Sequence, residues 1–192
     1  MIGRYLHGMA MKGLILTPNN TSFDCYVDAS HAGEWNHTNA ENDPTTACSR
    51  SGYVITYHNC PLLWALKMQT EIALSSMEAE YIVLSQSLQE VIPLMALIKE
   101  AKNYGLDITS HKVKVHCRLF EDNTGAIELA KVPKMRPRTK HLNLKYHHFR
   151  EHVRCGIISI HAVTTNQQIA DIFMKPLNQS LFVQHRKRIV GW

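Results

Sequence analysis

The chain has 192 residues, of which 45% are hydrophobic, and its 21 Lys and Arg against 16 Asp and Glu give a formal net charge of +5. This composition excludes a chain kept disordered by its own charge and is typical of one domain with a sizeable core. The longest apolar runs, such as Ile92 to Ile98, are far shorter than the roughly 20 residues that span a bilayer. We therefore expect no transmembrane helix and no membrane partner.

The N-terminal segment and the cysteines argue against secretion. The segment MIGRYLHGMAMKGLILTP has no unbroken apolar stretch followed by a small-residue cleavage site. The five cysteines are odd in number and widely spaced, and they include no CxxC pair, which disfavours both a disulfide framework and a cysteine zinc site. We expect an intracellular protein with reduced thiols.

The first third of the chain has the pattern of three strands. Phe23 to Ala29 alternates apolar and polar residues, and Gly52 to Tyr57 and Leu62 to Leu66 flank a short connection that is typical of a turn. Between them, Glu34 to Thr46 lacks apolar periodicity, which predicts a loop. The pattern favours three antiparallel strands.

The longest predicted helix runs from Ser75 to about Asn103. Its apolar residues recur every three or four positions, which is helical periodicity. Pro93 lies inside this stretch and should remove one backbone hydrogen bond.

The second half of the chain alternates strands and helices. We predict strands over Val113 to Leu119 and Ile157 to Val163, a short helix that follows residues 121–123 and runs through Ala130, and helices from His141 to Val153, from Gln167 to Lys175 and from Leu181 to Val190. Three strands, a helix and this further series make a mixed α/β order.

Four acidic residues fall where the predicted elements would bring them to one end of a sheet: Asp28, Glu78, Asp122 and Asp171. Carboxylate oxygens are the ligands that hard divalent cations prefer, and several carboxylates held together repel one another unless a cation lies among them. Such a cluster could hold two Mg²⁺ ions about 4 Å apart for phosphodiester hydrolysis.

Each of these residues also has a purely structural explanation. Asp28 could be a turn residue at a strand end. Ser75 to Glu78 fits a capping box. Asp122 could cap the following helix, and Asp171 lies early in a helix, where a negative charge is favoured. The local pattern leaves both explanations open for each residue.

Five segments, in order along the chain, resemble the ribonuclease H domain of copia-type long-terminal-repeat retrotransposon Pol polyproteins, which lies C-terminal to the reverse transcriptase. They are YVDASHAG (26–33), ALSSMEAEYIVLS (73–85), EDNTGAIELA (121–130), RTKHLNLKYHHFREHV (138–153) and QQIADIFMKPL (167–177). The resemblance implies an α/β, ribonuclease H-like fold, in which three antiparallel strands and two further strands form a five-stranded mixed sheet flanked by helices.

The resemblance also implies a reaction. It identifies Asp28, Glu78, Asp122 and Asp171 as metal-binding catalytic carboxylates for two Mg²⁺ ions, with Mn²⁺ as a substitute, in hydrolysis of the RNA strand of RNA/DNA hybrids during reverse transcription. Glu80 is the competitor for Glu78, and the two point about 200° apart on a helix, so both cannot face one metal site. The family pattern and the flanking buried stripe favour Glu78. Ser30 and Met174 depart from the family's usual Asp and Thr.

The same resemblance divides the chain into three parts. Residues 1–21 are similar to the segment that follows the reverse transcriptase in such polyproteins, residues 22–178 form the ribonuclease H-like domain, and residues 179–192 form a basic C-terminal tail or helix. It implies the reverse transcriptase domain of the same polyprotein as a partner and a cytoplasmic retrotransposon particle as the setting.

A basic segment follows the third acidic motif. Between residues 131 and 154 there are eight Lys or Arg and one acidic residue, a formal charge of +7. Such a block is often a solvated face, but phosphate neutralisation supplies most nonspecific affinity for nucleic acid. The predicted nucleic-acid-binding residues are Lys131, Lys134, Arg136, Arg138, Lys140, Lys145 and Arg150.

Two other functions fit the same residues. The chain could be a catalytically inactive nucleic-acid-binding module of a degenerate retroelement polyprotein, or a nuclease that acts on DNA. Hybrid binding without turnover would favour the first, and cleavage of duplex DNA with hybrid left intact would favour the second.

Overall fold

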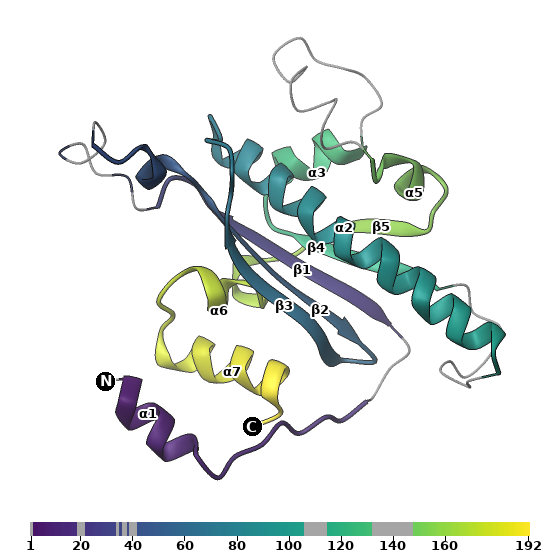
Figure 1. Cartoon of the computed structure of the whole chain (residues 1–192), viewed down its shortest axis with the longest axis horizontal. Coiled ribbons are helices and arrows are strands. Elements are labelled where there is room, and N and C mark those ends of the chain that lie inside the picture. The colour runs from purple at the N-terminus through teal and green to yellow at the C-terminus, as the bar shows by residue number, and fades with distance from the viewer. Residues whose placement is uncertain are drawn as a thin grey trace.

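A mixed five-stranded sheet forms the centre of the structure, a computed structural model that describes residues 2–18, 22–33, 35, 38, 42–105, 115–131 and 148–192 (Figure 1). The strand order is β3-β2-β1-β4-β5, with β1, β2 and β3 antiparallel and with β4 and β5 parallel to β1. The strands are β1 (Phe23–Ser30), β2 (Arg50–Tyr57), β3 (Cys60–Met68), β4 (Cys117–Glu121) and β5 (Ile158–Ala162). This topology confirms the predicted α/β fold class.

Helices cover both faces of the sheet. They are α1 (Ile2–Met9), α2 (Ser76–Asn103), α3 (Thr124–Lys131), α5 (Arg150–Arg154), α6 (Asp171–Met174) and α7 (Gln179–Val190), with 3₁₀ turns η1 (Pro44–Ala47) and η3 (Thr165–Gln167). Helix α2 crosses one face, with α3 and α5 on the same side, while α6 and α7 lie on the other side (Figure 1).

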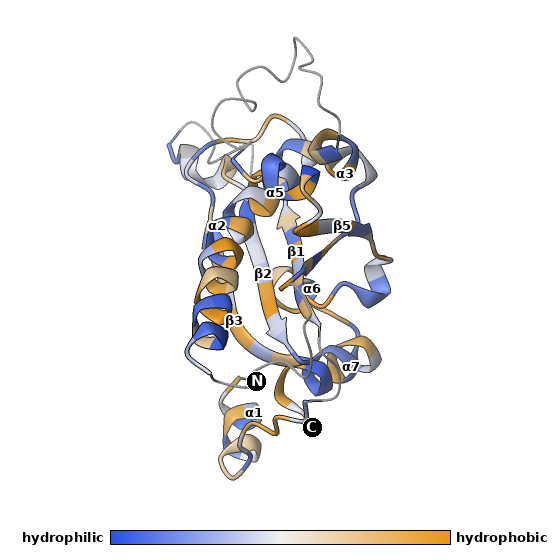
Figure 2. Ribbon diagram, turned by 90° about the vertical axis from the view of Figure 1, so that its right-hand side faces the viewer, coloured by the Kyte–Doolittle hydropathy of each residue, from blue (hydrophilic) through white to orange (hydrophobic). Residues whose placement is uncertain are grey.

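The alternation of β1 divides the core between these two faces. Phe23, Cys25 and Val27 pack into the large cluster beneath α2, while Tyr26 belongs to a smaller cluster beside α6 with Ile169. Because the sheet is covered on both faces, apolar residues of β1 pack on both of its sides. Hydrophobic residues run through the strands of the sheet (Figure 2). Asp28 follows Tyr26 by two positions and so shares the face of the sheet on which α6 lies.

The core helix α2 starts with the predicted cap, since Ser75 Oγ accepts a hydrogen bond from the Glu78 amide at 3.2 Å. Pro93 lies on its exposed side and does not end the helix. By length and composition α2 could cross a membrane, but 56% of its most apolar window is buried inside the domain, as in the core helix of a folded protein.

Two predicted elements differ from the structure. The helix predicted from Gln167 to Lys175 is divided into η3 and the short helix α6, with Gln168, Ile169 and Ala170 buried between them. The strand predicted over Val113 to Leu119 begins at Cys117, and its first two residues lie outside the described residues.

The helix predicted from His141 to Val153 is only partly described. Residues 141–147 lie outside the described part of the chain, and α5 begins at Arg150.

The N-terminal segment packs against the C-terminal helix α7. The Ile15 amide donates to the Val190 carbonyl at 3.0 Å, the Trp192 indole donates to the Gly13 carbonyl at 2.9 Å, and Tyr5 meets Phe182 edge-on. Gly191, at φ +86°, has no room for a Cβ, which would collide with the Ile15 carbonyl oxygen. The segments predicted as the two flanks of the domain therefore contact each other.

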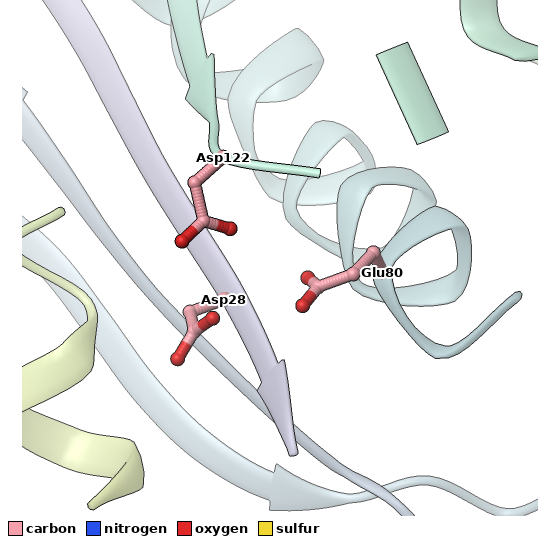
Figure 3. A group of neighbouring side chains, drawn as sticks. All are labelled: Asp28, Glu80 and Asp122. Atoms are coloured by element: carbon pink, nitrogen blue, oxygen red, sulfur yellow. The ribbon is translucent and has the colours of Figure 1, made fainter. Parts of the chain in front are cut away.

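The strand ends place the candidate site. β1 and β4 are paired as far as Tyr26 and Phe120, and Asp28 and Asp122 each follow two residues later. Because parallel strands end at the same edge of a sheet, both carboxylates come to one edge, where the first turns of α2 also lie (Figure 3).

Candidate metal centre

Three carboxylates from separate elements converge at this edge of the sheet. Asp28 from β1, Glu80 from α2 and Asp122 from the residue after β4 each offer one oxygen, and these oxygens lie within 4.8 Å of one another (Figure 3). Asp28 and Glu80 are both only 6% exposed. Three oxygen ligands at this spacing match the preference of a hard divalent cation such as Mg²⁺.

The structure brings Glu80, not Glu78, into this group, which reverses the choice made from the sequence. Glu78 Oε2 instead accepts a hydrogen bond from the Leu74 amide at 3.0 Å, so this side chain turns back toward the start of the helix. Glu80 lies about 200° further round α2 and faces Asp28 and Asp122. The capping explanation thus applies to Glu78, and the candidate metal ligand is Glu80.

Asp122 is not the cap of α3. That role belongs to its neighbour Asn123, whose Oδ1 accepts a hydrogen bond from the Ala126 amide at 3.1 Å. Asp122 Oδ2 instead accepts from the Thr165 hydroxyl at 3.1 Å. Asp122 is therefore available to the cluster, and η3 supplies the residue that orients it.

Asp171 adjoins the group without being one of its three members. It is the first residue of α6, is fully buried, and lies near enough to Asp28 to raise the pKa of that carboxyl group. Its Oδ1 lies 2.8 Å from Nζ of Lys175, one helical turn later. The structure thus brings three of the predicted residues, Asp28, Asp122 and Asp171, to one place.

Burial and mutual repulsion govern the charge state of the cluster. Burial raises the pKa of Asp28 to about 8, and the neighbouring carboxyl group of Asp171 adds to this effect. Burial also raises the pKa of Glu80 to about 11, and the charges of Glu121, Asp28 and Asp122 add to this effect. Without a cation, the carboxyl groups of Asp28 and Glu80 therefore hold protons at neutral pH. A divalent cation would favour their charged forms.

Two buried oxygens support this fit. Glu80 Oε2 and Glu121 Oε2 are inaccessible and have no hydrogen-bond partner among the described residues. Buried polar atoms normally have partners, and a cation in the cluster would supply one for Glu80. The residues present therefore suit a divalent ion.

Glu121 is a buried acid that sequence reasoning missed. It is fully buried, its Oε1 accepts from the Asn123 amide at 2.9 Å, and burial holds its pKa well above the ordinary value. The alternation of β4 was the available signal, because Glu121 continues the buried positions Cys117 and Leu119.

The curated proteins that resemble this chain include Pol polyproteins of plant transposons. The chain is 32% identical over 187 residues to the retrovirus-related Pol polyprotein from transposon RE2 of Arabidopsis thaliana, a match that covers 97% of the chain. It is 29% identical over 98% of its length to the corresponding polyprotein from transposon TNT 1-94 of Nicotiana tabacum. The chain spans only 12% and 13% of the lengths of these two relatives. No family model matches the chain.

Among solved structures, LC11-RNase H1, isolated from compost by a metagenomic approach, superposes with a TM-score of 0.53. The match covers 80% of this chain and 93% of that protein, at 14% sequence identity. The chain is a ribonuclease H-fold relative of the retrotransposon Pol polyproteins. At this identity, the superposition establishes the fold, and the reaction has to be argued from the chain's own residues.

Gln168 ties the segment before α6 to the ribonuclease H sheet. It is fully buried, and its Nε2 donates to the carbonyl of Val27 at 2.7 Å and lies 3.4 Å from that of Phe120. It thus joins β1 and β4 where they cease to pair, through Val27, one residue before Asp28, and Phe120, two residues before Asp122.

Replacing Gln168 with Leu is expected to destabilise the fold by about 1–3 kcal/mol, because the buried Val27 carbonyl loses its donor. Urea denaturation of both proteins measures this change. Gln167→Leu, at the exposed neighbouring position, is the control, and an equal loss in both variants would contradict this role.

Only two of the predicted nucleic-acid-binding residues belong to the described part of the chain. Lys131 is exposed at the end of α3. Arg150 is partly buried, and its Nη2 donates to the Leu129 carbonyl at 2.7 Å, so it joins α5 to α3. The other five lie outside the described residues: Lys134, Arg136, Arg138, Lys140 and Lys145.

Proposed function

We propose that the chain is a metal-dependent endonuclease that hydrolyses the RNA strand of RNA/DNA hybrids during retrotransposon reverse transcription. The observation that carries this proposal is the group formed by Asp28, Glu80 and Asp122, whose oxygens lie within 4.8 Å of one another at the strand ends of a ribonuclease H fold. The relationship to Pol polyproteins supports the choice of substrate.

In this proposal, Asp28, Glu80 and Asp122 hold Mg²⁺, or Mn²⁺ in its place, and Asp171 completes the site next to Asp28. The bound metal would lower the pKa of water and stabilise charge on the phosphate that is cleaved. The chain's own contribution is orientation. The Ala29 amide hydrogen-bonds to Glu80, and the Thr165 hydroxyl bonds to Asp122, so neighbouring elements hold two ligands before substrate arrives.

The basic segment supplies the phosphate contacts in this proposal. Lys131 stands at the end of α3, the helix that follows the Asp122 loop, and the segment from 131 to 154 carries eight basic residues against one acidic residue. Arg150 serves this surface by fixing α5 to α3. Contacts to 2′-hydroxyl groups on one strand and the shape of the duplex would distinguish hybrid from DNA.

The proposed setting is a Pol polyprotein in a cytoplasmic retrotransposon particle, with the reverse transcriptase domain of the same polyprotein as the partner. The match to 12% of a much longer Pol polyprotein supports this setting. In that arrangement, the hybrid made by polymerisation is the substrate of the nuclease.

The test is cleavage of an end-labelled RNA/DNA hybrid by the purified chain in Mg²⁺ and in EDTA. We expect cleavage that is selective for hybrid over single-stranded RNA and duplex DNA, and that is lost in EDTA and in Asp122→Asn. Hybrid binding without cleavage in Mg²⁺ or Mn²⁺ would instead favour a nucleic-acid-binding module. Cleavage of duplex DNA with hybrid left intact would identify a DNA nuclease.

A further inference from the structure

Lys175 places a positive charge inside the acidic site. Its Nζ lies 2.8 Å from Asp171 Oδ1, and the Asp171 side chain is completely buried while that of Lys175 is 46% exposed. Lys175 follows the last residue of α6, so the pair spans one turn at the end of this helix. A buried carboxylate is thus neutralised by a cation that enters from the solvent side.

The ammonium group of Lys175 interacts electrostatically with several carboxylates of the cluster and not with Asp171 alone. Asp171, Asp28 and Asp122 all act electrostatically on Lys175, and Lys175 acts in turn on Asp28. From the other face, α2 contributes Glu80, which belongs to the same cluster. Among the described residues, Lys175 is the basic side chain whose charge lowers the pKa of Asp28, against the larger effect of burial.

Only one of the four carboxylates, that of Asp171, is paired with Lys175. Asp28, Glu80 and Asp122 form one three-oxygen group, whereas Asp171 is not a member of this group, acts on Asp28 and is paired with Lys175. A second divalent cation bound between Asp28 and Asp171 would have to share the Asp171 carboxylate with Lys175, whose Nζ lies 2.8 Å from Asp171 Oδ1.

We propose that Lys175 occupies the place of a second divalent cation, so that the free protein binds one ion at Asp28, Glu80 and Asp122. The second ion enters only when a substrate phosphate draws the ammonium group away from Asp171. The lysine side chain is flexible and 46% exposed, which permits this displacement. The inference rests on the metal site of the proposed function, but it concerns the number of ions bound without nucleic acid.

The charge of Lys175 offsets part of the negative charge of the cluster, as a bound cation would. Asp28, Asp122 and Asp171 all act electrostatically on its ammonium group. A neutral side chain at position 175 would leave that part of the negative charge for a second ion. Removing the charge of Lys175 should therefore allow a second divalent ion to bind.

The experiment counts bound Mn²⁺ by electron paramagnetic resonance, with no nucleic acid present. We expect one tightly bound ion in the wild type, one in Lys175→Arg and two in Lys175→Gln, a twofold rise. The double variant Asp171→Asn/Lys175→Gln should return to one. Lys99→Met is the matched control, because Lys99 lies 19 residues after Glu80 in α2, about 28 Å along the helix axis, and should leave the count at one.

Circular dichroism verifies the fold of each variant, and Lys175→Met provides a second neutral side chain if Lys175→Gln does not fold. Two tightly bound ions in the wild type, or one in the folded neutral variants, would overturn the inference. Hybrid cleavage is measured on the same wild-type sample. Cleavage with an unchanged ion count refutes the role of Lys175 alone, whereas a raised count without cleavage refutes the proposed nuclease alone.

Discussion

Replacing Glu80 with Gln is expected to lower the rate of hybrid cleavage at least about 1,000-fold, whereas Glu78→Gln should leave it within a factor of a few. Glu80 shares the cluster with Asp28 and Asp122, while Glu78 hydrogen-bonds to the Leu74 amide. A bound metal contributes several kcal/mol to the stabilisation of transition-state charge, and each 1.36 kcal/mol corresponds to a tenfold change in rate. Loss of one ligand should therefore remove most of the rate.

Single-turnover cleavage of hybrid in saturating Mg²⁺ measures both variants. They form a matched pair, because each exchanges one buried glutamate for its neutral isostere within the same helical turn. Gln retains the side-chain oxygen that accepts from the Leu74 amide, so Glu78→Gln keeps the helix cap. Equal losses in the two variants, or a larger loss in Glu78→Gln, would contradict the placement of Glu80 in the site.

The two glutamates show where sequence reasoning about the site stops. Ser75 and Glu78 fit a capping pattern, and the structure contains the Ser75 cap, while the Glu78 carboxylate accepts from the amide of Leu74, one residue earlier than a capping box requires. A residue that already satisfies the helix start is thereby less available to a metal, but sequence spacing alone does not decide between the two glutamates in a helix whose residues 78 to 85 are all buried. Thirteen residues of α2 are buried, and both glutamates are among them.

Other parts of the site follow directly from the order of elements. Alternation placed Asp28 and Asp122 at the ends of two strands, and the parallel pairing of β1 with β4 brings those ends together. Gln168 and Lys175 were not predictable in this way. Their roles depend on the division of one expected helix into η3 and α6, which lets a buried amide reach the Val27 carbonyl. Such contacts arise from tertiary packing and leave no periodic signal in the sequence.

The metal-free protein is expected to lose stability as pH rises from about 7 to about 8.5. Asp28 has a folded-state pKa of about 8 and Glu80 one of about 11, both above their ordinary values of 3.8 and 4.5. In this pH window the folded state therefore binds more protons than the unfolded state, and the free energy of unfolding falls as pH rises. The window lies above the titration of His148, His161 and His185, whose lowered pKa values act in the opposite sense at lower pH.

Thermal unfolding in EDTA measures this fall, which should be about 2 kcal/mol or more and lower Tm by roughly 4–8 °C. Asp28→Asn should show a smaller fall, because its neutral amide has no proton to lose, while Glu128→Gln on the exposed face of α3 should behave as the wild type. Mg²⁺ should abolish the fall, since a cation bound only by the folded state replaces the protons and stabilises that state by mass action. Stability that rises with pH in EDTA would mean that the carboxylates are already ionised and balanced within the chain. In that case the protein would not need a divalent cation to hold them together.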